Sequence, residues 1–430
     1  MRTSDRGSSG ISGLPLALLL ATTQMLAFSD RFLITLVAQP LKVDLDLSDA
    51  QLGILQGSAF AFLNAAAMPW AGGIADRGHR RALLMASVLA WSAATLLCGF
   101  AGSFAVMVAA RALLGLGQAA VAPAALSLLV HHLPREKLGR AVSLMTAGIS
   151  LGRTVALLAG GAVLAWLSAS SPLEVLGFGA IRPWQALFVL ACIPNFALLA
   201  GLWRVVEPPA APVRDGRPAY AWMWRHRATY LPHFGAAAAT MLINQALTAW
   251  APTFYVRVHG LTPAESGLHL GLVVLISAPL GHLAGGHWLD WARTRMPRTA
   301  ASRALAFGLA LTPICTAGMV LANSTAVSLI AFGALIAALG FSSPAALAGL
   351  QFVTPRRFRG RTSAIFVAGV TLVAFGAGPV LIGVVNDRVV GPQHVGMAML
   401  SVFGAVALVG IALAIAACPL EPRRRDVILP

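Results

Sequence analysis

The sequence predicts an all-α polytopic membrane protein in which twelve transmembrane helices form two six-helix bundles related by internal duplication. Of its 430 residues, 58% are hydrophobic and only 11% are charged, whereas ordinary soluble proteins carry about 25% charged residues. Apolar runs long enough to cross a bilayer recur along the chain, and short motifs of the first half return in the second. This composition excludes a disordered chain, a collagen-like fibre and a disulfide-stapled secreted domain.

The apolar runs give the transmembrane segments. A bilayer core about 30 Å thick needs about 20 apolar residues in a helix, and a lipid-exposed backbone must satisfy its own hydrogen bonds. The predicted spans of the first half are 14–38, 49–71, 82–101, 104–132, 140–167 and 183–204. Those of the second half are 231–257, 265–289, 300–322, 327–351, 361–386 and 395–417. We therefore expect a tail over 1–13, a first bundle over 14–204, a central loop over 205–230, a second bundle over 231–417 and a tail over 418–430.

The net charge of +16 reflects membrane topology, because the cations form short clusters between apolar runs and no basic domain is present. Most of the 31 Lys and Arg residues fall in the termini, the central loop and alternate loops. Lys and Arg are enriched in cytoplasmic loops, so both termini and the central loop are predicted to be cytoplasmic in a cell inner membrane. The other loops hold only four cations: Lys42, Arg182, Arg257 and Arg388.

Recurring motifs indicate the duplication. The sequence Pro123-Ala124-Ala125-Leu126 returns as Pro344-Ala345-Ala346-Leu347, and Gly72 with Asp76 returns as Gly286 with Asp290. Parallel repeats of this kind enclose a substrate site at their interface near the bilayer midplane.

The loop after the second span carries a family resemblance. It reads Gly72-Gly73-Ile74-Ala75-Asp76-Arg77-Gly78-His79-Arg80-Arg81, and with it the sequence resembles the major facilitator superfamily over nearly its whole length. Within that superfamily the chain is most similar to the bacterial spinster-like transporters, through Asp30-Arg31, Trp250-Ala251-Pro252-Thr253, Gly378-Pro379 and Asn386-Asp387. The resemblance implies a conformational gate that holds the outward-facing state by charge contacts. Its residues would be Gly72, Asp76, Arg77, Arg80 and Arg81, with Gly286, Asp290 and Arg293 as a weaker second copy.

Four charged residues lie well inside predicted spans, away from the helix ends: Asp30, Arg31, Arg111 and Arg153. A charge at the bilayer centre costs from about 2.5 to more than 10 kcal/mol, so such side chains face a cavity or a partner. Asp30 and Arg111 lie at similar predicted depths, and we expect them to pair. An arginine neighbour favours the ionised carboxylate and isolation favours the neutral acid, which makes Asp30 the candidate proton-coupling residue. The alternative is an ion pair that only locks helices together.

Amide side chains complete the candidate site. Gln118 shares a helix face with Arg111, and spinster-like relatives commonly carry a glutamate at its position. Because an amide cannot titrate, either Asp30 couples protons alone or the protein is a facilitator. Asn244 is the counterpart of Asp30 in the second half, and Gln245 follows it. They are candidates for substrate contact, and polar contact between helices is an equal alternative.

Three embedded arginines and one aspartate favour an anionic solute, because the planar guanidinium pairs with carboxylate and phosphate. The resemblance to spinster-like transporters, some of which move lysophospholipids or sphingoid phosphates, implies a proton-coupled secondary active transporter of a small anionic or amphipathic, lysolipid-like solute. An organic-anion symporter or a drug:proton antiporter of the same superfamily is the alternative, ahead of a membrane enzyme or a non-transporting receptor. We expect no cofactor, metal or nucleic-acid partner, and a monomer in the lipid bilayer. The four cysteines, Cys98, Cys192, Cys315 and Cys418, have no metal-ligand spacing.

Overall fold

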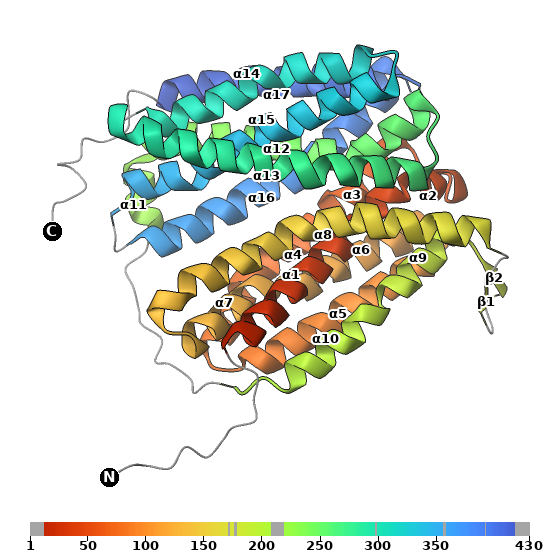
Figure 1. The fold of residues 1–430 in the computed structure, drawn as a ribbon, viewed down its shortest axis with the longest axis horizontal. Coiled ribbons are helices and arrows are strands. Elements are labelled where there is room, and N and C mark those ends of the chain that lie inside the picture. Colours follow the sequence, from red (N-terminus) through yellow and green to blue (C-terminus); the bar gives the residue numbers. More distant parts are fainter. Residues whose placement is uncertain are drawn as a thin grey trace, which may run out of the picture. The chain divides into compact units, whose positions relative to one another are not determined.

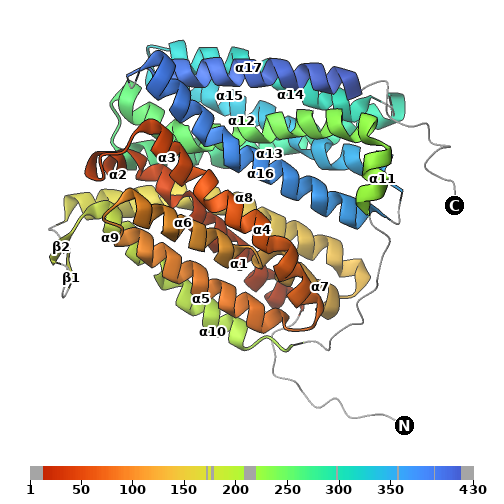
Figure 2. The same cartoon turned by 180° about the vertical axis from the view of Figure 1, so that it is seen from behind.

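The computed structural model describes residues 13–170, 173–175, 179–207, 219–296, 299–355, 358–391 and 393–417. These residues are almost entirely helical (Figure 1, Figure 2). Each predicted apolar span is occupied by one helix or by two consecutive helices, which confirms the predicted fold class in its main feature.

The first half contains ten helices within its described residues, and four of the predicted spans are each divided between two helices. The helices are α1 (Gly13–Leu36), α2 (Ala38–Asp44), α3 (Asp49–Gln56), α4 (Ser58–Asp76), α5 (Arg80–Gly99), α6 (Phe104–Gln118), α7 (Val121–His132), α8 (Arg135–Ala169), α9 (Pro183–Ala191) and α10 (Ile193–Trp203).

Proline and close packing explain several of these divisions. Pro40 has no N–H to donate to the carbonyl of Leu36, where α1 ends, and Pro194 has none for Leu190 near the end of α9. At Gly57, between α3 and α4, a Cβ atom would lie 2.2 Å from the carbonyl oxygen of Phe375. Only glycine permits that approach.

The second half continues with longer helices. They are α11 (Ala219–Arg225), α12 (Arg227–His259), α13 (Pro263–Arg295), α14 (Ala300–Leu321), α15 (Thr325–Val353), α16 (Arg359–Val385), the π-helix η2 (Asn386–Val390) and α17 (Val395–Ala417). Eleven stretches of the described chain are long and apolar enough to cross a membrane. The predicted span over 231–257 falls outside these eleven. It lies within α12, whose polar residues, among them Asn244 and Gln245, lower its hydropathy.

One short segment departs from the all-α prediction. Strands β1 (Leu173–Val175) and β2 (Gly179–Ile181) form an antiparallel hairpin between α8 and α9, with Leu173 opposite Ile181. The connection carries no apolar run of helical length. Strand pairing instead satisfies its backbone hydrogen-bonding groups.

The described chain groups into two compact units. The first lies within Met1–Leu33, Phe62–Ala156 and Trp166–Arg214, and the second within Ile34–Ala61, Leu157–Ala165 and Asp215–Pro430. The second unit therefore contains α2, α3 and short parts of α1, α4 and α8 together with α11 to α17. The predicted bundle boundaries, 14–204 and 231–417, stay a prediction.

Direct backbone contact between α3 and α16 explains why α3 belongs to the second unit. A Cβ atom at Gly53 of α3 would lie 2.5 Å from the carbonyl oxygen of Pro379, and one at Gly383 of α16 would lie 2.2 Å from that of Asp49. Small residues permit such close approach of helices in a membrane. Trp250 of α12 supports the same crossing, since its Nε1 donates a hydrogen bond to the Pro379 carbonyl over 2.9 Å.

Replacing Gly383 by alanine is expected to destabilise the protein by about 1–3 kcal/mol, because the added methyl overpacks a backbone contact. The matched control is Gly376→Ala on the same helix, where a Cβ atom would meet nothing within 4 Å. There the better helix propensity of alanine should leave stability unchanged or slightly raised. Thermal unfolding of the two purified variants measures the difference, and equal melting temperatures would contradict the close contact.

Candidate functional site

The first unit contains a buried polar cluster that includes most of the predicted membrane-embedded charges. Asp30 and Arg31 lie on α1, and Arg111 and Gln118 lie on α6; all four are buried. The cluster is polar in an otherwise apolar surrounding, so its hydrogen bonds determine what each charge can do.

The Asp30 carboxylate is held by neutral donors. Its Oδ2 atom accepts hydrogen bonds from Thr95 Oγ1 on α5 at 3.4 Å and from Asn195 Nδ2 on α10 at 3.3 Å. Arg111 Nη2 instead donates to the backbone carbonyl of Arg31 over 3.2 Å. The expected Asp30–Arg111 ion pair is therefore not formed within the described part of the chain. Thr95 and Asn195 were missed by sequence reasoning, although Asn195 is a polar residue inside an apolar span.

Gln118 is the hydrogen-bond partner of Arg31. Its Oε1 atom accepts from Arg31 Nε at 3.2 Å and from Nη2 at 2.9 Å, and its Nε2 donates to the Ala27 carbonyl at 2.7 Å. The Arg31 guanidinium also lies 4.3 Å from the centre of the Phe28 ring. The amide thus fixes the position of the cation without neutralising its charge.

Arg153 reaches the same part of α1 from α8. Its guanidinium lies 5.1 Å from the centre of the Phe32 ring. Two glycines of α8 allow the close approach, because a Cβ atom at Gly148 would lie 2.2 Å from the Ala21 carbonyl and one at Gly152 would lie 2.5 Å from that of Met25. Three arginines from three helices thus neighbour the segment of α1 that carries Asp30.

The predicted amides of the second half lie on α12 in the second unit. Gln245 is buried. Thr248 donates to the Asn244 carbonyl at 2.7 Å, and its Oγ1 lies 3.5 Å from Asn244 Oδ1. Local contacts on α12 therefore engage Asn244.

In the first predicted gate motif, Gly72 and Asp76 belong to α4, and the side chain of Asp76 lies outside the described part of the structure. Arg77 is exposed, whereas Arg80 is buried. The Arg80 guanidinium bonds Ser127 Oγ at 2.7 Å and His131 Nε2 at 3.1 Å, both on α7.

Glu207, which follows α10 and was not predicted from the sequence, contacts the end of the Gly72–Arg81 loop. Its two carboxylate oxygens accept hydrogen bonds from the backbone N–H groups of Arg80 and Arg81, at 2.8 and 2.7 Å. These groups begin α5 and have no acceptor within the helix, so a carboxylate there is favourable.

The second copy of the motif is weaker. Asp290 and Arg293 approach to 3.9 Å, and both side chains are solvent-exposed. Exposed pairs of this kind contribute at most about 1 kcal/mol. At Gly286 a Cβ atom would meet nothing within 4 Å.

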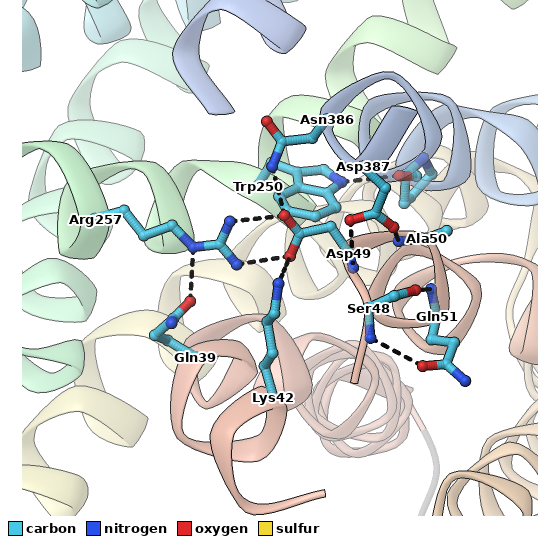
Figure 3. A network of polar contacts seen from close by, with 11 residues as sticks. Gln39, Lys42, Ser48, Asp49, Ala50, Gln51, Trp250, Arg257, Asn386 and Asp387 are labelled. Carbon is cyan, nitrogen blue, oxygen red and sulfur yellow. Dashed lines mark hydrogen bonds and ion pairs between the residues drawn. The ribbon is translucent and has the colours of Figure 1, made fainter. Parts of the chain in front are cut away.

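A second polar cluster surrounds Asp49 in the second unit, and Figure 3 shows it. Asp49 is fully buried. Its carboxylate accepts two hydrogen bonds from Arg257, Nη1 to Oδ2 at 2.8 Å and Nη2 to Oδ1 at 2.7 Å. It also accepts hydrogen bonds from Lys42 Nζ and Asn386 Nδ2. The arrangement is a two-pronged arginine–carboxylate pair with a second cation beside it.

Asp387 binds the beginning of α3 in the same cluster. Its Oδ1 accepts from the Asp49 N–H at 3.1 Å, and its Oδ2 accepts from the Ala50 N–H at 2.7 Å. Gln39 Oε1 accepts from Arg257 Nε at 2.9 Å. The cluster therefore connects residues 39–50 to α12 and η2 (Figure 3).

Sequence reasoning did not identify the Asp49 cluster. In the sequence, Lys42 and Arg257 stood out only as two of the few cations in the loops on the side predicted to lie outside. Asn386-Asp387 stood out only as part of the family resemblance. The small number of cations in these loops could have indicated the cluster. The enrichment of Lys and Arg in cytoplasmic loops does not account for a single cation in a loop on the other side, so a carboxylate partner was to be expected.

Comparisons with known proteins identify the fold. The sequence matches the family model described as Major Facilitator Superfamily over residues 20–302. It is 28% identical to an MFS-type efflux pump of Mycolicibacterium smegmatis, over 91% of this chain and 89% of that protein. It is also 28% identical to the gentisate transporter of Corynebacterium glutamicum, over 66% of this chain and 63% of that protein.

A solved structure has the same architecture. The crystal structure of a bacterial homolog to the human lysosomal transporter spinster, in an inward-facing and occupied conformation, superposes with a TM-score of 0.76 at 22% identity. The match covers 94% of each chain.

Proposed function

The chain belongs to the Major Facilitator Superfamily, and from this premise we propose that it is a proton-coupled secondary transporter of a small organic anion. An amphipathic molecule with an anionic headgroup, such as a lysolipid, belongs to the same class. Transport would proceed by alternating access, in which a central site opens to each side of the membrane in turn.

The buried Asp30 carboxylate carries the proposal. It is held by two neutral donors, Thr95 and Asn195, rather than by an arginine. Such a carboxylate can bind a proton in one state and pair with a cation in another, since a nearby opposite charge favours its ionised form. Arg31 follows Asp30 on α1, and Arg111 donates to the Arg31 carbonyl, so a change in helix packing could bring one of these cations to Asp30.

The surplus of cations supports the solute class. Arg31 lies on α1, Arg111 donates to the Arg31 carbonyl and Arg153 lies against Phe32 of the same helix, and guanidinium groups bind carboxylate and phosphate with paired donors. The similarity to a gentisate transporter points in the same direction, because gentisate is a carboxylate. Gln118 would position Arg31 for the solute, and Asn244 and Gln245 would offer hydrogen bonds from α12.

The Asp49 cluster supports an outer gate. If the termini are cytoplasmic, as the distribution of Lys and Arg favours, residues 39–50 lie at the outer ends of the helices. The cluster joins this segment of the first half of the chain to α12 and η2 of the second half. It would close the outer side of the pathway, and the Gly72–Arg81 loop would act on the cytoplasmic side. The transporter would work as a monomer in the inner membrane.

Transport by purified protein in liposomes tests the proposal. We expect an imposed pH gradient to drive accumulation of an aromatic carboxylate such as gentisate, and collapse of the gradient by a protonophore to stop it. A matched aromatic ammonium compound should not accumulate. Equal accumulation with and without the gradient would indicate a facilitator.

The similarity to an efflux pump over most of the chain favours a second candidate, a drug:proton antiporter. Preference for the ammonium compound in the same assay, moved against the proton gradient, would support it and would remove the organic-anion proposal.

A further inference from the structure

The Trp222 side chain packs the short helix α11 against the rest of the second unit. Trp222 Nε1 donates to the hydroxyl of Tyr230 over 3.2 Å, and the Trp222 ring stacks on Phe358 with 5.6 Å between ring centres. The Tyr230 hydroxyl lies 3.0 Å from Thr354 Oγ1. Met223 packs against the same apolar cluster. One face of α11 is thus occupied by the protein itself.

The opposite face presents aromatic rings to the surroundings. Tyr220 and Trp224 lie four residues apart, hence on one side of the helix, and are 68% and 69% exposed. In a soluble protein such exposure of large rings would be unfavourable. In a membrane protein, tryptophan and tyrosine are enriched where the hydrocarbon meets the headgroups. The exposed face of α11 therefore fits the membrane–water interface.

A recess lies where α11 ends and α12 begins. It has a volume of about 430 Å³ and is lined by Arg225, Arg227, Ala228, Leu231 and Pro232. Both arginines are exposed, and none of these lining residues is acidic. Leu231 is 58% exposed although it belongs to α12, whose next turns enter the apolar span. The lining of the recess thus combines two cations with apolar side chains.

Arg227 is held in place within this site. Its guanidinium lies 5.5 Å from the centre of the Trp224 ring, and its Nη1 donates to the Trp224 carbonyl over 3.3 Å. A guanidinium that rests on an aromatic ring keeps donors available for an anion. The order of Arg227 lowers the entropy that a ligand would have to offset.

We propose that this recess binds an anionic glycerophospholipid of the surrounding bilayer. The phosphate diester would lie against Arg225 and Arg227, and the glycerol and first acyl carbons would lie against Ala228, Leu231 and Pro232. Basic pockets beside transmembrane helices bind anionic headgroups in this way. Free inorganic phosphate could pair with the two arginines but would make no contact with the apolar side chains that line the recess. The site is separate from the proposed transport pathway and does not depend on the transported solute.

Lipid binding to the full chain in detergent, measured by native mass spectrometry, tests the assignment. Phosphatidylglycerol should bind more tightly than phosphatidylcholine of the same acyl composition. The R225Q/R227Q variant should lose about tenfold or more in affinity for phosphatidylglycerol, since it removes both cations that attract the anionic headgroup. The control R295Q/R303Q removes the same charge from exposed positions of α13 and α14, and its affinity should stay close to that of the unmodified protein.

Two further measurements separate the sources of the phosphate. Leu231→Asn should weaken phosphatidylglycerol binding while both arginines remain, and inorganic phosphate at equal concentration should not displace the lipid. The assignment would be overturned if the two arginine variants lost equal affinity or if the two lipids bound equally well. It would also be overturned if Leu231→Asn bound phosphatidylglycerol as tightly as the unmodified protein, or if inorganic phosphate displaced the lipid.

Discussion

Asp30→Asn is expected to abolish accumulation of solute against its gradient while leaving exchange of solute between the two sides of the membrane. The asparagine has nearly the same shape as the aspartate but cannot bind or release a proton. Its Oδ1 atom can keep the hydrogen bonds from Thr95 and Asn195. Its new N–H donor has an acceptor nearby, since Asn195 Oδ1 has no hydrogen-bond partner within the described structure. The variant should therefore fold.

Flux into liposomes under an imposed pH gradient, compared with counterflow at equal pH, gives the measurement. Asn195→Ala is the matched control, because it removes one donor to the carboxylate and leaves the titratable group in place. It should keep dependence on the pH gradient with a changed pH optimum. An Asp30→Asn protein that still accumulated solute in proportion to the gradient would end the role of Asp30 in coupling.

Gln118 allows a complementary experiment. Its side-chain amide accepts two hydrogen bonds from Arg31 and donates one to the Ala27 carbonyl. Gln118→Glu would place a second titratable group beside Arg31, and only the protonated acid could still donate to Ala27. We expect the difference in stability between this variant and the unmodified protein to change with pH, because the added carboxyl group can ionise and the amide cannot. Thermal unfolding across pH would show whether the two profiles differ.

The sequence predicted the helices well because their cause is local. A run of apolar residues must form a helix in lipid, and α1, α5, α8 and α13 to α17 follow directly from such runs. The divisions of spans were not predicted, because a break such as that at Gly57 depends on Phe375, a residue more than three hundred positions away. Pro40 and Pro194 were visible, but proline inside a membrane helix does not always end it.

The candidate site was predicted in composition and not in connectivity. A lone carboxylate and three arginines within apolar spans are costly, so their presence marked the site from sequence alone. Their partners depend on helix rotation, which hydropathy does not determine. Arg111 thus donates to the backbone at Arg31, and neutral Thr95 and Asn195 hold Asp30. Glu207 was missed because it lies in a loop where a carboxylate has no evident cost.

Asp49→Asn is expected to lower the stability of the protein by about 3–5 kcal/mol, because removing one member of a buried ion pair leaves its partner uncompensated. Arg257 and Lys42 would then face each other without the negative charge that both now contact. Lys42 and Arg257 keep 19% and 10% of their side-chain surface exposed, so the loss should fall toward the lower end of that range. Thermal or denaturant unfolding in detergent measures it.

Asp387→Asn serves as the control, because it weakens the cap on α3 and leaves the Asp49 pair intact. Loss of a helix cap costs about 0.5–2 kcal/mol, less than the loss of Asp49. The double variant Asp49→Asn with Arg257→Gln should recover part of the stability, since it removes one of the two cations that Asp49 now neutralises. The coupling energy from this cycle distinguishes a stabilising pair from two independent polar residues.

If the cluster closes the outer side of the pathway, Asp49→Asn should also favour conformations in which residues 39–50 separate from α12. Distances between spin labels on these two segments would then lengthen in the variant and stay short in Asp387→Asn.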